Sequence, residues 1–195
     1  SLSTVPVEIM IPLDNNQLLA EDTLSGGADK VLRFAQPMKV NITPDNSGKW
    51  EKTENGQLLW RTRIRSAGAL SLNFGFSRYV MPPGGRLLLY DISGKHVRRP
   101  FTAADNESHG QLWTPIVFGD EIVIEVQVPA VTPLGLELVL NSVNHGYRDI
   151  SASAVLSGAC NVDVVCGAAD GLSEVDSWRS EIRSVAAYST GGSLF

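Results

Sequence analysis

Between residues 57 and 140 the chain repeatedly alternates apolar and polar side chains with a period of two. Successive side chains of a strand point to opposite faces, so each run predicts a β-strand with one apolar face. Such strands must cover one another's apolar faces, which favours two sheets packed face to face. The expected core consists of Leu58, Trp60, Ile64, Leu70, Leu72, Phe74, Phe76, Ile122, Ile124, Val126, Leu136 and Leu138.

Other segments extend this all-β pattern. Residues 86–92 are nearly all apolar and predict a central strand between two glycine-containing turns. Residues 5–11 predict an edge strand, because proline is tolerated at edges and strand starts. Residues 30–42 predict a strand interrupted at Pro37, and the Asn55-Gly56 pair is typical of a tight hairpin.

Helical signals are scarce. No long segment has a period of 3.6 residues, and the polar run at residues 14–16 is typical of a turn. The one helix that the pattern predicts covers residues 174–183, with Ser173 as its N-cap.

Composition narrows the class of protein. Hydrophobic residues make up 43% of the 195 residues and charged residues 19%, which is typical of a globular chain. The net charge of −5 disfavours nucleic-acid binding, for which a basic face is expected. No apolar run approaches the ~18 residues of a membrane span. No His pair or Cys/His cluster has zinc-ligand spacing, so we expect neither metal nor cofactor.

The chain divides into three parts. Residues 1–149 carry the strand pattern and predict an antiparallel, jelly-roll-like β-sandwich. Residues 150–157 are small and polar, as in a linker. Residues 158–195 differ from residues 1–149 in their residue pattern and contain both cysteines.

The chain contains no local sequence sign of a Ser-His-Asp catalytic triad. A triad needs a serine, a histidine as base and an acidic residue that orients the histidine. His96, His109 and His145 each stand beside turn residues, and we expect all three to be loop histidines. We therefore predict no catalytic residue within the chain.

Two sets of side chains are candidate binding residues. Arg61, Arg63 and Arg65 point the same way from one predicted strand and form either an anion contact or a solvated face. Trp50 is the tryptophan with the best prospect of exposure, and it supports the alternative of a glycan or peptide ligand.

Cys160 and Cys166 lie six positions apart, on one face if the segment is a strand. A strand would hold their Cα atoms ~20 Å apart, beyond the ~4.4–6.8 Å that a disulfide requires. A local bond between them would need a turn through residues 162–165, which are poor turn formers.

Residues 158–195 begin GACNVDVVCG and continue with Trp178-Arg179 and IRSVAAYSTGG. This run resembles the start of the catalytic domain of bacterial secreted trypsin-like serine endopeptidases of the lysyl endopeptidase type. The order of motifs in residues 73–148 is similar to the domain that precedes those peptidases. The resemblance implies that residues 158–195 start a trypsin-like double β-barrel, with the catalytic residues after Phe195. It also implies disulfides from Cys160 and Cys166 to that domain.

The same resemblance implies a function for residues 1–149. They would be a non-catalytic pro-domain that helps the chain's own C-terminal peptidase domain to fold and limits its activity before secretion through the periplasm. His145, Tyr147 and Arg148 match the family pattern, so we expect them either to dock the sandwich on the peptidase or to form a strand end. The alternative function is a ligand- or carbohydrate-binding module that targets the enzyme.

Overall fold

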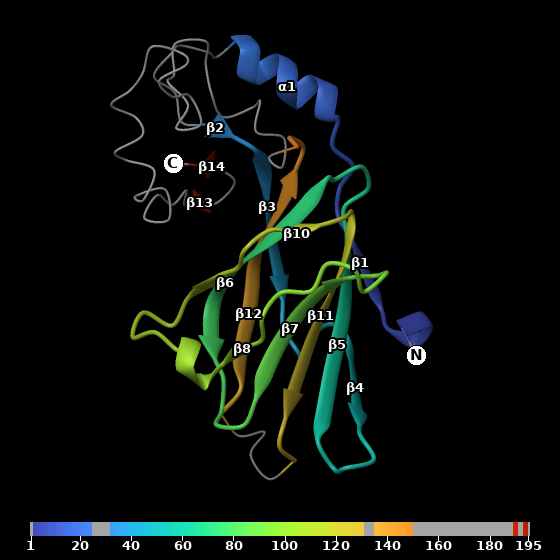
Figure 1. The fold of residues 1–195 in the computed structure, drawn as a ribbon, viewed down its shortest axis with the longest axis vertical. Helices are drawn as coiled ribbons and strands as arrows, with labels where there is room; N and C mark the ends of the chain where they lie inside the picture. The colour runs from blue at the N-terminus through green and yellow to red at the C-terminus, as the bar shows by residue number, and fades with distance from the viewer. Residues whose placement is uncertain (1, 25–31, 131–134, 150–188, 191–192, 195) are drawn as a thin grey trace, which may run out of the picture.

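The computed structural model describes residues 2–24, 32–130, 135–149, 189–190 and 193–194. These residues form mainly β-strands, arranged as two large sheets that pack face to face (Figure 1). The predicted linker, the helix predicted at residues 174–183 and both cysteines lie outside the described residues.

The first sheet has the strand order β1-β5-β11-β7-β8, and β4 also pairs with β5. The β1–β5 pair is parallel and the other pairs are antiparallel. The edge strand predicted near the N-terminus is confirmed as β1, and the apolar segment at residues 86–92 is confirmed as an interior strand, β7. The bounds are β1 (Val7–Ile9), β4 (Lys49–Lys52), β5 (Leu58–Arg65), β7 (Arg86–Asp91), β8 (Phe101–Thr102) and β11 (Glu121–Val128).

The second sheet has the order β10-β6-β12-β3, and β9 pairs with β6; every pair is antiparallel. Its bounds are β3 (Ala35–Ile42), β6 (Ser71–Val80), β9 (Leu112–Trp113), β10 (Val117–Phe118) and β12 (Glu137–Gly146). Pro37 lies within β3, the last strand of the sheet, where a missing N–H removes no bond from a central ladder.

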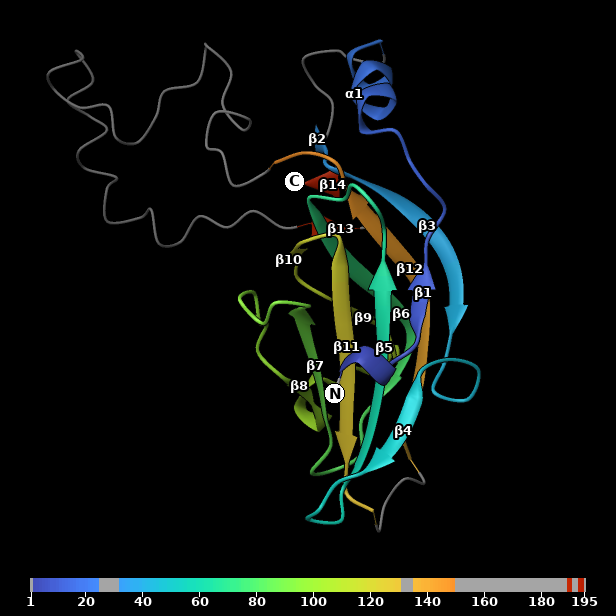
Figure 2. The ribbon, with the colours of Figure 1, turned by 90° about the vertical axis from the view of Figure 1, so that its right-hand side faces the viewer.

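One end of the sandwich carries additional elements (Figure 2). They are the helix α1 (Asn15–Leu24) and a small antiparallel sheet of β2 (Leu32–Arg33), β14 (Ser193–Leu194) and β13 (Ser189–Thr190). Two short 3-10 helices, Leu2–Thr4 and Ala103–Asp105, complete the described elements. Reading residues 14–16 as a turn was wrong, because Asp14 is the N-cap of α1. Its carboxylate accepts hydrogen bonds from the backbone N–H groups of Asn16 (2.9 Å) and Gln17 (3.3 Å).

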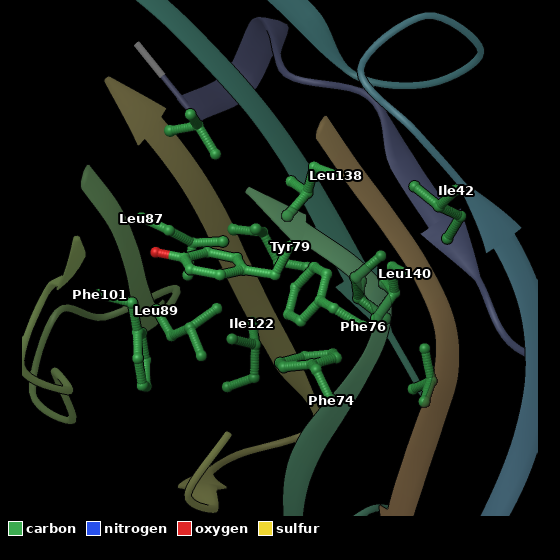
Figure 3. Packing of buried hydrophobic residues seen from close by; sticks show 14 of the residues in the cluster. Ile42, Phe74, Phe76, Tyr79, Leu87, Leu89, Phe101, Ile122, Leu138 and Leu140 are labelled. Carbon is green, nitrogen blue, oxygen red and sulfur yellow. The ribbon is translucent and has the colours of Figure 1, made fainter. Parts of the chain in front are cut away.

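The core between the two sheets confirms the period-two prediction. Trp60, Phe74 and Ile124 are buried where expected, and Leu58 and Leu136 pack against the core while half-buried. Figure 3 shows the ring of Tyr79 reaching from β6 toward Leu87 and Phe101 of the opposite sheet. The Tyr79 hydroxyl donates a hydrogen bond to the carbonyl of Thr102 at 3.1 Å, so the ring stays buried with its polar atom bonded.

The strand β6 departs from the prediction in two places. Leu70 was expected in the core, but it precedes β6 and is 45% exposed. Ser71, Asn73 and Gly75 alternate with the predicted core residues of β6, yet they are buried as well. At Gly75 an added Cβ would lie 2.6 Å from the Trp113 ring, so this ring covers the outer face of β6 there.

We expect Phe74→Ala to lower the free energy of unfolding by about 3–5 kcal/mol, because the substitution leaves a cavity between the sheets. Urea denaturation of the 195-residue chain measures the effect. Leu70→Ala is the matched control, and its exposed side chain predicts a loss below about 1 kcal/mol. Equal losses for the two variants would contradict the assignment of the core.

Candidate functional site

The helix α1 presents a mixed face to the sandwich. Asn15, Leu18 and Asp22 occupy positions i, i+3 and i+7, which lie on the same side of a helix. Leu18 is the buried apolar residue of this face. Asn15 and Asp22 flank it and enter two separate polar clusters, so the helix is attached at both ends.

The first cluster surrounds His145, which is buried in β12. Its Nδ1 lies 2.7 Å from the hydroxyl of Ser66, and its Nε2 lies 2.8 Å from Oδ1 of Asn15. Asn15 in turn donates from Nδ2 to the carbonyl of Gly68 at 2.8 Å. The chain of bonds therefore joins α1, β12 and the turn that follows β5.

These bonds determine the tautomer of the imidazole. Because the amide nitrogen of Asn15 donates to a carbonyl, Oδ1 is the acceptor and Nε2 of His145 carries the proton. A neutral ring then accepts the Ser66 hydroxyl proton at Nδ1. Burial disfavours the charged ring and lowers the pKa of His145 below its ordinary value.

Serine, histidine and an amide side chain in a row resemble a catalytic triad, but the arrangement does not fit one. In a serine peptidase Nε2 faces the serine and Nδ1 faces the acidic residue, whereas here Nδ1 faces Ser66. Ser66 is 1% exposed and His145 is fully buried, so no substrate reaches the hydroxyl. The cluster acts by holding three segments together.

The second cluster surrounds the carboxylate of Asp22. Oδ1 accepts from Nε of Arg33 at 2.8 Å, and Oδ2 accepts from the Tyr147 hydroxyl at 2.7 Å and from Nη2 of Arg148 at 2.8 Å. Arg148 also donates from Nε to the carbonyl of Arg33 at 3.0 Å. The cluster thus joins α1, β2 and the segment directly after β12.

The charges in this cluster stabilise one another. Burial alone would raise the pKa of Asp22, but hydrogen bonds from Arg148 and Tyr147 and the charge of Arg33 outweigh it, so the pKa is lowered. Burial, together with the bond to the Asp22 carboxylate, raises the pKa of Tyr147 to about 12, so its hydroxyl remains a donor. Both guanidinium groups lie within 6 Å of the Tyr147 ring centre, at 5.6 Å for Arg33 and 5.8 Å for Arg148.

The residues His145, Tyr147 and Arg148 lie at the end of β12 and directly after it, in agreement with the strand-end alternative. Predicting His145 as a loop residue was wrong, because it lies within β12 and is fully buried. Tyr147 is 2% exposed. All three side chains bond to α1 or β2, so a docking contact with a peptidase domain stays a prediction.

The other candidate residues lie elsewhere. Arg61 pairs with Glu51 and Arg63 with Glu121, both on neighbouring strands, while Arg65 is exposed. The anion contact predicted for these three arginines stays a prediction.

Two of the histidines were assigned correctly. His96 and His109 are exposed loop residues, and Nδ1 of His109 accepts from the backbone N–H of Gln111 at 3.0 Å.

In the part of the chain that the structure describes, no three His, Cys, Asp or Glu side chains are grouped as metal ligands. No helix there is long and apolar enough to cross a membrane.

Sequence reasoning missed Asn15, Asp22, Arg33 and Ser66. All four are polar: Asn15 stands in a run that was interpreted as a turn, and Arg33 stands in a predicted strand. Asp22 and Ser66 stand in segments that had been given no role. One signal was available: Asp14 as N-cap, followed by side chains at i, i+3 and i+7, indicates a short helix with a partly polar contact face.

We expect Asp22→Asn to lower the free energy of unfolding by about 1–3 kcal/mol, because it removes charge-assisted bonds from Arg33 and Arg148. Glu21→Gln is the matched control: this neighbouring carboxylate is 47% exposed and lies 3.6 Å from Arg33. The control should lose less than about 1 kcal/mol. Urea denaturation at neutral pH measures both, and equal losses would contradict the role of the cluster.

Stability should also fall with acidification because of His145. Its folded pKa lies below the ordinary value of 6.5, so the unfolded chain binds more protons between these two values. The contribution is complete above about pH 6.5 and is lost as the pH falls through the folded pKa. Urea midpoints at pH 8 and pH 5 should differ less in His145→Gln than in the unaltered chain. His109→Gln, at an exposed position, should leave the difference unchanged.

Comparison with known proteins identifies the sandwich. The family model of the lysyl endopeptidase N-terminal domain matches residues 31–147, which extend from just before β2 to Tyr147. A lysyl endopeptidase of Pseudomonas aeruginosa is 29% identical over 140 residues, which are 66% of this chain and 29% of that protein. The chain therefore spans less than a third of the length of this relative. More than half of the chain matches the family model, and the chain belongs to the lysyl endopeptidase N-terminal domain family.

Proposed function

We propose that the β-sandwich is the non-catalytic pro-domain of a secreted, trypsin-like serine endopeptidase. The observation that carries the proposal is the order of the two blocks. The family match ends at Tyr147, and the motif resembling a peptidase start follows from residue 158. In this proposal residues 150–157 are the linker, and the sandwich is of the jelly-roll type.

The chemistry of the described residues supports a non-catalytic role. His145 and Ser66 lie in hydrogen-bond contact, but both are buried and the ring is reversed relative to a triad. His96 and His109 are loop residues whose surroundings do not form a triad. Catalytic residues would then come from the chain after Phe195, and Cys160 and Cys166 would bond to that domain.

A folding role has a physical basis. A trypsin-like double β-barrel depends on pairing between distant strands, and such topologies fold slowly because loop closure comes before the stabilising contacts. A domain that folds first and binds the early strands would lower this entropic cost. The same binding would restrain the peptidase until the precursor has crossed the periplasm.

The 195-residue chain should therefore hydrolyse no lysyl ester by itself and should inhibit the mature peptidase of its own precursor. The assay follows lysyl ester hydrolysis while the chain is added to the mature enzyme, with a peptidase of unrelated fold as the control. Inhibition should saturate near one chain per enzyme, with at least a tenfold loss of rate. An undiminished rate at high excess would reject the inhibitory role. Intrinsic activity that a serine-directed inhibitor abolishes would reject the non-catalytic one.

A second candidate function is glycan binding. Trp50 is 38% exposed and lines a pocket of about 440 Å³ together with Asp45, Arg78 and Glu137. An aromatic face beside polar groups is the chemistry that holds a sugar ring. This role predicts quenching of tryptophan fluorescence by oligosaccharides, absent in Trp50→Ala and retained in Trp113→Ala. No quenching with a panel of bacterial and plant glycans would reject it.

A further inference from the structure

We propose that β2 is a docking edge for the first strands of the peptidase domain and that β14 occupies it by strand addition. The identity of the docked segment as a peptidase start rests on the proposed function. The surface at which the sandwich meets this segment is β2, and the Asp22 cluster holds β2 in place.

Two segments that are far apart in the sequence pair at this edge. The strand β14 is antiparallel to β2, with Ser193 opposite Arg33 and Leu194 opposite Leu32. The strand β13 extends the sheet on the other side of β14, with Ser189 opposite Leu194. Figures 1 and 2 place these three strands at the same end of the sandwich as α1, and α1 is the helix that enters both polar clusters.

Strand addition suits a contact between a domain and the segment that follows it. An open sheet edge presents unpaired N–H and C=O groups. An extended segment satisfies them with its own main-chain groups, so pairing depends little on which side chains it carries. The small sheet is separate from the two sheets of the sandwich, so β14 adds to β2 without disturbing their order.

The Asp22 cluster fixes the backbone of β2. The carbonyl of Arg33 accepts from Nε of Arg148 at 3.0 Å. The carbonyl of Phe34, the next residue, accepts from the backbone N–H groups of Tyr147 (3.0 Å) and Arg148 (3.3 Å). Asp22 also accepts a hydrogen bond from the guanidinium of Arg33 at 2.8 Å. An edge held in this way loses little conformational entropy when another strand adds to it.

The residues Tyr147 and Arg148 are thus positioning residues for the docking edge. Tyr147 is buried and Arg148 is engaged with Asp22 and with the backbone of Arg33, so neither needs to touch the docked segment.

The position of β14 in the chain has a consequence for cleavage. The predicted linker at residues 150–157 precedes β13 and β14, so cutting it leaves them on the C-terminal product. The β2–β14 pairing then joins the two products without a covalent bond. After cleavage the sandwich should remain associated with the segment that carries β13 and β14.

Cysteine pairs test the pairing in the 195-residue chain after Cys160 and Cys166 are replaced by serine. Opposite residues of an antiparallel pair have Cα atoms ~4.5–5.5 Å apart, within the range for a disulfide. Leu32→Cys with Leu194→Cys should therefore form a disulfide under mild oxidation. The matched control is Leu32→Cys with Ser189→Cys, in the same row but one strand further away, at ~10 Å.

Mass spectrometry of the unreduced, digested protein reads the result. We expect at least a tenfold excess of the disulfide-linked peptide in the Leu194 pair over the Ser189 pair. Equal yields, or a Leu194 pair that stays reduced, would overturn the proposal.

Hydrogen exchange gives a second measurement in the unsubstituted chain. Every buried core residue of the described part lies between Val5 and Tyr147, so a chain ending at residue 149 keeps the whole core. Backbone amides in a peptide covering residues 32–34 should exchange at least tenfold more slowly in the 195-residue chain than in the shorter one. Equal exchange rates would also overturn the proposal. Both readouts are independent of peptidase inhibition, so the docking edge and the pro-domain role can fail separately.

Discussion

The carboxylate of Asp22 is the interaction on which one end of this domain depends. It is largely withdrawn from solvent, and a charge in that position is stable only when it is paired and hydrogen-bonded. Its partners come from β2 and from the segment after β12. Without this carboxylate Arg148 would lose its ion pair, and Arg33 would keep only the more exposed carboxylate of Glu21 at 3.6 Å. The helix α1 would keep Leu18 and Asn15 as its main contacts.

The domain therefore uses two kinds of cohesion. Between the sheets, apolar side chains such as Phe74, Tyr79 and Leu87 are buried against one another, and their contribution depends on area and packing. At the α1 end, hydrogen bonds and ion pairs depend on geometry and on protonation. The family match begins at residue 31, after α1, so the partners that Asn15 and Asp22 supply lie outside the matched region.

The predictability of each part follows from this difference. Strands with one buried face alternate apolar and polar residues in the sequence, which is why Trp60, Phe74 and Ile124 were placed correctly. Burial of Asn73 on the outer face of β6 leaves no such pattern, because it depends on neighbours that are distant in sequence. The helix α1 was missed because a contact face of an amide, a leucine and a carboxylate has little apolar periodicity. His145 was misplaced because histidine beside glycine is common in turns, and only the paired strands show that it lies inside.

Pro37 gives the domain a further property. The strand β3 closes its sheet, and its outer edge carries a proline without an N–H and an exposed lysine, Lys39. Both features discourage edge-to-edge polymerisation between copies of a β-protein. A protein made in quantity meets many other copies of itself. With the long edge of β3 blocked and only a two-residue edge proposed at β2, strand addition within one chain would be favoured over fibre assembly between chains.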